Sequence, residues 1–500
     1  MNGLNNKLIL LGYSYKMKFR NLLSNRDISA LIFILVATLA AYIPSYISTY
    51  GFSDDYSTYF AANLSHTNFI KWDVMSGRPA YAVLRYIAGK FIETTSDFTF
   101  FRLLSVISIA ALGGYLYFFL KKVSFPGGVV AWAVTPVLLC SLPSVSLFGA
   151  WATCFPYVAS ILLCGASYST LNHCKNLRPA IRFFISLFLL SFAFAIYQPT
   201  GMAFSFFMLI DNCLSNNSIE YKKIINNAIM MALGMVASLA FSKVIPTAVY
   251  GETFARSALA NSIEEKASWF FDKPFHDAIS NYSIFHSPLY FNLSLALFIA
   301  SLIFVGLQND GFKKAALAII IIIGSFSPNL IIAESWVSYR SLVSLELCIG
   351  VVMAFGMASF TNRFNFRSVA LSVAAAYAVF SCASFIYTNF VRQYDQESIV
   401  LKTAIKDKIT KDYTGYLMFD ISNPEWNVFS PTKYDEIGAP SIQIAWAISG
   451  FADSLRKEMG YNFRISNAAT DASVLSTDVK SCSKDCTIIK VTDRLRLIKD

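Results

Sequence analysis

Long apolar runs alternate with short polar connections from residue 28 to residue 387. A helix needs about 20 apolar residues to cross the hydrocarbon core of a bilayer. Runs that meet or approach this length predict about eleven membrane-spanning helices. The predicted spans are 28–49, 100–120, 125–142, 151–170, 183–197, 200–214, 224–245, 289–307, 315–332, 341–360 and 369–387. We therefore expect an α-helical polytopic membrane protein.

Basic residues fall in every second connection between these spans. Cytoplasmic loops of membrane proteins are enriched in Lys and Arg, so we expect these connections on the cytoplasmic side. The N-terminus is then cytoplasmic, and the C-terminal region lies on the opposite side. The clusters are Lys7 to Arg26, Lys121 and Lys122, Lys175 with Arg178 and Arg182, Lys222 and Lys223, Lys313 and Lys314, and Arg363 with Arg367.

The composition is that of a membrane protein. Hydrophobic residues make up 55% of the chain and charged residues 14%, whereas soluble domains are about 25% charged. The net charge of +10 does not indicate a nucleic-acid partner, because the positive residues lie in short clusters between apolar runs. No nucleic-acid-binding motif is present. The expected surroundings are membrane lipid.

The polar parts of the chain suggest two domains. We predict a transmembrane domain over 1–388, with outer loops at 50–99 and 246–288, and a small C-terminal domain over 389–500. Apolar patterning in that domain predicts strands and a helix, and hence an α/β fold. The expected strands are 415–419 and 487–491, and the expected helix is 441–458.

Cys482 and Cys486 lie four residues apart in this polar region. The pair makes a poor zinc site, because no further Cys or His lies nearby. In an extracytoplasmic domain a local disulfide is the better prediction.

Two adjacent acidic residues, Asp54 and Asp55, follow the first predicted span. At the outer surface of the membrane that the chain spans, a carboxylate can take a proton from a reacting hydroxyl group. Asp is also a favoured N-cap, so the pair could simply begin an amphipathic helix. The local sequence leaves both interpretations open.

Two arginines in or beside the outer loops could complete such a site. A departing lipid phosphate needs a fixed cation, for which the forked guanidinium group of Arg78 or Arg340 is suited. Alternatively, Arg340 only reaches toward lipid headgroups, or Glu334 pairs with it across a short turn. The rings of three tryptophans could hold a sugar, or could belong only to the belt of aromatic residues at the membrane interface. These candidates are Trp72, Trp269 and Trp336.

Three short motifs carry a resemblance to a known family. They are Asp54 and Asp55 after the first span, Gly77 and Arg78 opening a helix some twenty residues later, and Tyr197 and Gln198 at the head of a central hairpin. In these motifs, and in its length, topology and polar C-terminal region, the chain resembles the O-antigen glucosyltransferases of serotype-converting (Gtr) operons in enteric bacteria. The resemblance implies a GT-C type fold in the bacterial inner membrane, with a periplasmic active site and a periplasmic C-terminal domain.

The resemblance also implies a reaction. A hexose, glucose in that family, would pass from undecaprenyl phosphate to the O-antigen of lipopolysaccharide with inversion. It further implies a companion flippase and a donor synthase. Asp54 and Asp55 are then the candidates for the catalytic base, and Arg78 and Arg340 for the donor phosphate. The candidate substrate-binding residues are Trp72, Tyr197, Gln198 and Glu334. We expect no cofactor, and an Asp pair without a third nearby carboxylate gives no clear metal site.

Two other functions remain open from the sequence. An O-antigen polymerase or ligase would centre on a large outer loop, where Arg256 lies. A transporter of the lipid-linked sugar would need charges along its spans. Glu346 is the one clear carboxylate inside a predicted span, which disfavours transport.

Overall fold

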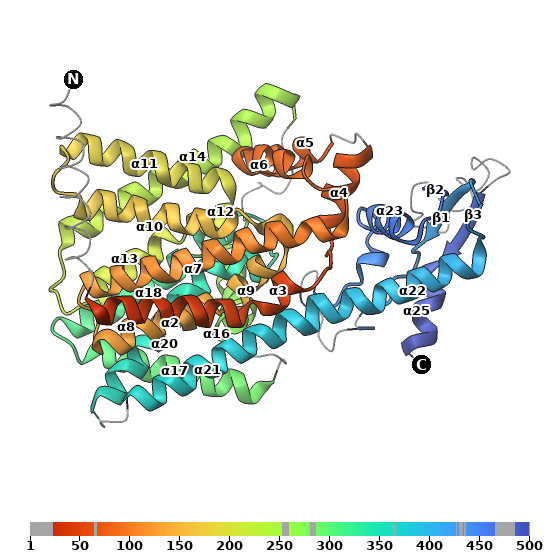
Figure 1. Ribbon diagram of the computed structural model, residues 1–500. Helices are drawn as coiled ribbons and strands as arrows, with labels where there is room; N and C mark the ends of the chain where they lie inside the picture. The colour runs from red at the N-terminus through yellow and green to blue at the C-terminus, as the bar shows by residue number, and fades with distance from the viewer. Residues whose placement is uncertain are drawn as a thin grey trace, which may run out of the picture.

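The chain forms a bundle of apolar helices with a small α/β module beyond one end (Figure 1). The computed structural model describes residues 24–64, 68–252, 260–280, 287–363, 367–426, 428–429, 434, 437–465 and 486–499. Each of the predicted spans falls on a helix. These helices are α2 (Asn25–Ala41), α7 (Phe98–Lys122), α8 (Gly128–Cys140), α10 (Tyr157–His173), α11 (Pro179–Ile196), α13 (Phe204–Cys213), α14 (Tyr221–Tyr250), α17 (Pro288–Gly306), α18 (Gly311–Gly324), α20 (Tyr339–Arg363) and α21 (Arg367–Ile386).

The helix lengths establish a multi-pass membrane protein. In the described part of the chain, seven helical segments are individually long and apolar enough to cross a membrane. The bent pair of α8 and α9 (Pro143–Ala150) adds an eighth if it forms one span. Helices α2, α13 and α18 have 17, 10 and 14 residues, which is less than a full span. The total of eleven crossings therefore stays a prediction.

Helix α9 is a departure from the expected pattern, since residues 143–150 were expected to belong mostly to a connection. It meets α8 at an angle of 63°, and Pro143 occupies its first turn, where proline is tolerated. Buried Glu346 of α20 accepts hydrogen bonds from the backbone nitrogen and hydroxyl group of Ser144, at 3.1 and 2.6 Å. The carboxylate thus satisfies the free N–H at the start of α9, which gives Glu346 a structural role.

The basic connections share one end of the bundle. Helices run alternately in the two directions (Figure 1), and polar contacts join their ends there. These contacts are Lys121 to Asp27 at 2.6 Å, Lys223 to Asp211 at 2.8 Å, and Lys314 to the carbonyl oxygen of Ser215 at 2.8 Å. The alternation inferred from charge is therefore present in the fold. The cytoplasmic assignment of this end stays a prediction.

The opposite end carries the outer connections as short helices. The first loop contains more helix than its two expected amphipathic stretches. Its elements are α3 (Ile43–Ile47), α4 (Asp54–Leu64), α5 (Asn68–Met75), α6 (Pro79–Gly89) and η1 (Thr95–Asp97). Other short elements are η2 (Ala152–Cys154), α12 (Gln198–Gly201), α15 (Ile263–Phe270), η4 (Phe271–Phe275), α16 (His276–Ile279) and α19 (Ser327–Ile331). Arg256 lies outside the described residues.

A long helix carries the C-terminal module away from the bundle (Figure 1). Helix α21 continues through the π-helical turn η5 (Tyr387–Val391) into α22 (Arg392–Lys408), across the expected boundary at residue 389. The module contains a parallel sheet of three described strands in the order β2-β1-β3, confirming the α/β expectation. Its elements are β1 (Tyr416–Asp420), β2 (Arg464–Ile465), β3 (Cys486–Lys490), η6 (Ser441–Gln443), α23 (Ile448–Met459) and α25 (Val491–Lys499).

The helix expected over 441–458 is partly wrong. Its first residues form η6, and the α-helix begins only at Ile448. Tertiary hydrogen bonds hold this segment: the backbone nitrogen of Ile442 donates to Glu397, and that of Ser53 donates to Ser441 Oγ, both at 3.2 Å. These contacts override the local apolar spacing. They also attach the module to the first outer loop.

Candidate active site

Asp55 is a buried structural anchor at the start of α4. Its side chain has no solvent exposure, and it accepts hydrogen bonds from the backbone nitrogens of Phe52 and Thr153, at 3.1 and 2.8 Å. The first bond closes the turn before α4, and the second ties that turn to η2. Burial raises the pKa of Asp55 to about 7, although the nearby charge of Arg102 acts in the opposite direction.

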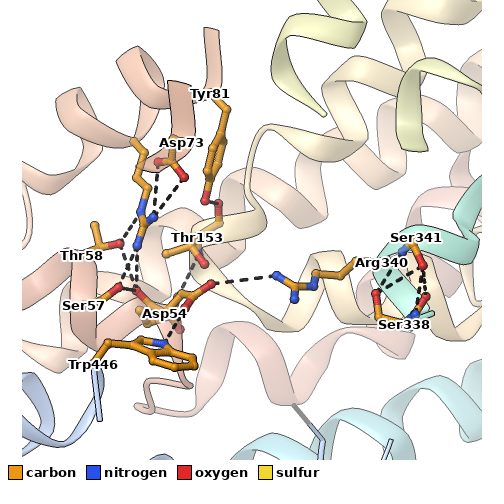
Figure 2. A network of polar contacts seen from close by, with 12 residues as sticks. Asp54, Ser57, Thr58, Asp73, Tyr81, Thr153, Ser338, Arg340, Ser341 and Trp446 are labelled. Atoms are coloured by element: carbon orange, nitrogen blue, oxygen red, sulfur yellow. Dashed lines mark hydrogen bonds and ion pairs between the residues drawn. The ribbon is translucent and has the colours of Figure 1, made fainter. Parts of the chain in front are cut away.

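Asp54 points the other way and is accessible. Its side chain is 32% exposed. One carboxylate oxygen accepts a hydrogen bond from Trp446 Nε1 at 2.9 Å, and the other lies 3.9 Å from a terminal nitrogen of Arg340. Figure 2 shows this carboxylate between the indole and the guanidinium group. The two adjacent acidic residues therefore occupy different environments.

Arg340 is held in a fixed position beside Asp54. Its guanidinium carbon lies 4.6 Å from the ring centre of Trp151 and 5.8 Å from that of Trp336. Such placement over an indole face is favourable for a cation. Ser338 and Ser341 exchange hydrogen bonds at the start of α20 (Figure 2). This local cap sets the first turn, from which Arg340 projects.

Arg78 forms a second cationic position. It lies at the N-cap of α6, 4.7 Å above the ring of Tyr197, which in turn stacks on Tyr157 at 4.3 Å. Arg78 Nε is buried and has no hydrogen-bond partner among the described residues. The positive charge of Arg340 acts on Arg78, so the two arginines belong to one electrostatic region.

Tyr197 and Gln198, which the sequence grouped with this site, hold Arg78 in place. Gln198 Nε2 donates to the carbonyl oxygens of Ser76 and Gly77, at 2.9 and 2.8 Å. Gly77 has a positive φ of 76°, a conformation that favours glycine, and a Cβ atom there would lie only 2.6 Å from Gln198 Nε2. The motifs Gly77-Arg78 and Tyr197-Gln198, far apart in sequence, are therefore in direct contact.

A buried ion pair supports the helix that presents Asp54. Arg85 Nη1 lies 3.3 Å from Asp73, and both side chains are almost fully buried. The same guanidinium group donates to Thr58 Oγ1 at 2.7 Å, to Ser57 Oγ at 2.8 Å and to the carbonyl oxygen of Asp54 at 3.3 Å. These bonds fix the first turn of α4 (Figure 2).

The local charges leave an excess of positive charge. Asp73 balances Arg85, and Asp55 lies near Arg102. Asp54 lies 3.9 Å from Arg340, and the charges of Arg340 and Asp73 act on Arg78. Four guanidinium groups (Arg78, Arg85, Arg102 and Arg340) against three carboxylates (Asp54, Asp55 and Asp73) suit a bound anion.

The remaining predicted site residues are Trp72 and Glu334. Trp72 is 52% exposed on α5. The carbonyl oxygen of Glu334 accepts a hydrogen bond from Lys266 Nζ at 3.0 Å, and this ammonium group lies over the ring of Trp269. The pairing of Glu334 with Arg340 stays a prediction.

The other ligand predictions concern cysteines and metal. Among the described residues, no three His, Cys, Asp or Glu side chains gather as metal ligands. Cys486 forms a disulfide. Its predicted partner Cys482 lies outside the described residues, so the pairing stays a prediction.

Two tryptophans that contact Arg340 and Asp54 were not predicted as site residues from the sequence. Trp151 was assigned to the start of a span, and Trp446 to the middle of a helix. Trp446 approaches Asp54 from a position 392 residues away in the sequence. Its location in a domain expected on the outer side was the one sequence signal that could have drawn attention to it.

Comparison with known proteins gives a likeness in solved structures only. No protein-family description matches the chain, and no curated protein has a significantly similar sequence. The chain is similar to the crystal structure of ArnT from Cupriavidus metallidurans in the apo state, with 10% identity, a TM-score of 0.43, and coverage of 94% of this chain and 90% of ArnT. For ArnT from the same organism bound to undecaprenyl phosphate, the identity is 11%, the TM-score 0.43, and the coverage 93% and 90%.

Proposed function

We propose that this chain is a GT-C type membrane glycosyltransferase that moves a hexose, glucose by the family resemblance, from undecaprenyl phosphate to the O-antigen of lipopolysaccharide. The proposal places the reaction at the periplasmic face of a bacterial inner membrane, where it would change the serotype. The observation that carries it is the accessible carboxylate of Asp54 beside Arg340, with Arg78 in the same region of excess positive charge.

Asp54 serves as the general base in this mechanism. It takes the proton from the acceptor hydroxyl group while that oxygen attacks the anomeric carbon of the donor sugar. The bond between the anomeric carbon and the phosphate oxygen breaks, and the phosphate keeps the electron pair. Attack from the face opposite the leaving group inverts the anomeric centre. The exposure of Asp54 supports this assignment over Asp55, whose two oxygens are occupied by backbone N–H groups.

Arg340 and Arg78 stabilise the departing undecaprenyl phosphate. Negative charge grows on the phosphate as the sugar leaves, and fixed guanidinium groups act most strongly on charge that develops in the transition state. Stacking on Trp151 and Tyr197 limits the movement of the two groups. The start of α20 is also where a lipid headgroup would meet the end of a membrane helix.

The other candidates have supporting positions in this proposal. Tyr197 and Gln198 keep Arg78 oriented toward the donor, and Trp72 and Glu334 border the substrates. The donor arrives from a companion synthase and flippase.

The test is O-antigen modification in cells that supply the lipid-linked sugar. Asp54→Asn should abolish transfer at normal membrane levels, because the amide keeps the size of the carboxylate but cannot accept the proton. Asp412→Asn is the matched control, since Asp412 is an exposed residue of the C-terminal module. Full modification by Asp54→Asn would remove the carboxylate from the mechanism and refute the proposal.

A further inference from the structure

Trp446 brings an exposed aromatic surface to the candidate base. It lies in the turn between η6 and α23 and is 58% exposed. Its single polar atom, Nε1, donates to Asp54 at 2.9 Å (Figure 2). A large apolar side chain at the surface normally gains by burial. Here the indole is instead exposed, with its N–H donated to the carboxylate.

The docking of the module fixes this arrangement. Phe451 of α23 stacks on Tyr56 of α4 with ring centres 4.5 Å apart and planes inclined by 13°. A Cβ atom at Gly450 would lie only 2.2 Å from the carbonyl oxygen of Tyr56, so the two helices touch at a glycine. Ser441 accepts a hydrogen bond from the turn before Asp54. The module and the first outer loop thus hold Trp446 and Asp54 together.

A second exposed indole lies close to the same charged pair. Trp336 is 39% exposed and approaches the guanidinium group of Arg340, which lies 3.9 Å from Asp54. One indole at the carboxylate and another at its neighbouring guanidinium group suit what a sugar ring presents: apolar C–H faces and a rim of hydroxyl groups. Indoles combine a broad apolar face with a polar N–H group.

We propose that Trp446 is the acceptor platform, and that the C-terminal module is therefore part of the active site. A sugar residue of the acceptor saccharide stacks on the indole face, which presents one of its hydroxyl groups to Asp54. The indole N–H also keeps the carboxylate oriented. This inference rests on the proposed function, and it assigns to the module the recognition of the acceptor rather than of the lipid donor.

Kinetic measurements on purified protein in nanodiscs separate the two roles of Trp446, which are stacking on the acceptor sugar and orienting the Asp54 carboxylate. Trp446→Ala should raise the apparent KM for lipopolysaccharide acceptor about tenfold, the size of one lost aromatic contact. Trp446→Phe keeps a ring face without the N–H group. It should restore most of the KM while lowering kcat, because Asp54 loses its orienting donor. Ile399→Ala, at an exposed position on α22, is the control.

Two binding measurements make the inference independent of turnover. Native mass spectrometry should show equal binding of undecaprenyl phosphate to wild type and Trp446→Ala. Delipidated O-polysaccharide should protect Trp446 from oxidation by N-bromosuccinimide, as read by peptide mass spectrometry, whereas polyethylene glycol of similar mass should not.

The outcomes distinguish this inference from the proposed function. If the wild type transfers sugar and Trp446→Ala keeps the wild-type KM, the platform is refuted while the transferase stands. Absent protection by O-polysaccharide also refutes it. If the wild type transfers nothing but Trp446 is protected, the proposed function fails and the saccharide site remains. Loss of undecaprenyl phosphate binding in Trp446→Ala would assign the residue to the donor and overturn the inference.

Discussion

Asp55→Asn should make the stability of this protein depend less on pH, because it removes the titration of Asp55. Burial raises the pKa of Asp55 from an ordinary value of 3.8 to about 7. The folded protein then holds this proton more tightly than the unfolded chain, so stability falls as the pH rises from about 4 to about 7. Each pKa unit corresponds to about 1.4 kcal/mol. Between pH 5 and pH 8 the wild type should lose about 3 kcal/mol through this one group.

The substitution has a cost that does not depend on pH. Asn offers one carbonyl oxygen to the two backbone N–H groups that Asp55 now satisfies. The second N–H group then faces an amide nitrogen, which cannot accept, whereas the hydroxyl oxygen of a protonated Asp55 still can; this difference costs about 1–3 kcal/mol. At pH 5 Asp55→Asn should therefore be less stable than the wild type, and at pH 8 the difference should vanish or reverse.

Fluorescence-monitored thermal unfolding in nanodiscs at pH 5, 6, 7 and 8 measures this effect. The wild-type midpoint should fall more steeply with pH than that of Asp55→Asn, with Asp412→Asn as the parallel control. A gap between wild type and Asp55→Asn that is constant with pH would refute the reasoning, because it would mean that the carboxylate stays in one protonation state over this range.

Two further substitutions test the supports of the site. Arg340→Lys keeps the positive charge but loses the planar group that stacks on Trp151, so kcat should fall about tenfold to a hundredfold in the transfer assay. Unchanged kcat would show that the planar guanidinium group is not needed at this position. Asp73→Asn leaves Arg85 buried without its carboxylate, which should destabilise the protein by about 3–5 kcal/mol, and an unfolding midpoint equal to that of the wild type would contradict the structural role of this pair.

Apolar runs are a local property, and this is why they predicted the helices. About twenty apolar residues in succession favour a helix in a bilayer wherever they occur. Strands β1 and β3 were also foreseen from short apolar segments. Where tertiary contacts compete, local pattern fails: Pro143 and the carboxylate of Glu346 create α9, and contacts to Glu397 and Ser53 keep 441–443 out of α23.

The sequence by itself determined that this is a multi-pass helical protein, that a small α/β module follows the last span, and that an acidic pair lies at the end opposite the basic connections. It left Asp54 and Asp55 equivalent. Only the tertiary structure separates them, because consecutive residues of a helix point about 100° apart, and what each meets depends on distant segments. Asp55 turns to the backbone of Thr153, whereas Asp54 faces Arg340 and Trp446. Contacts between residues hundreds of positions apart leave no local pattern, so the site became visible only when the chain was folded.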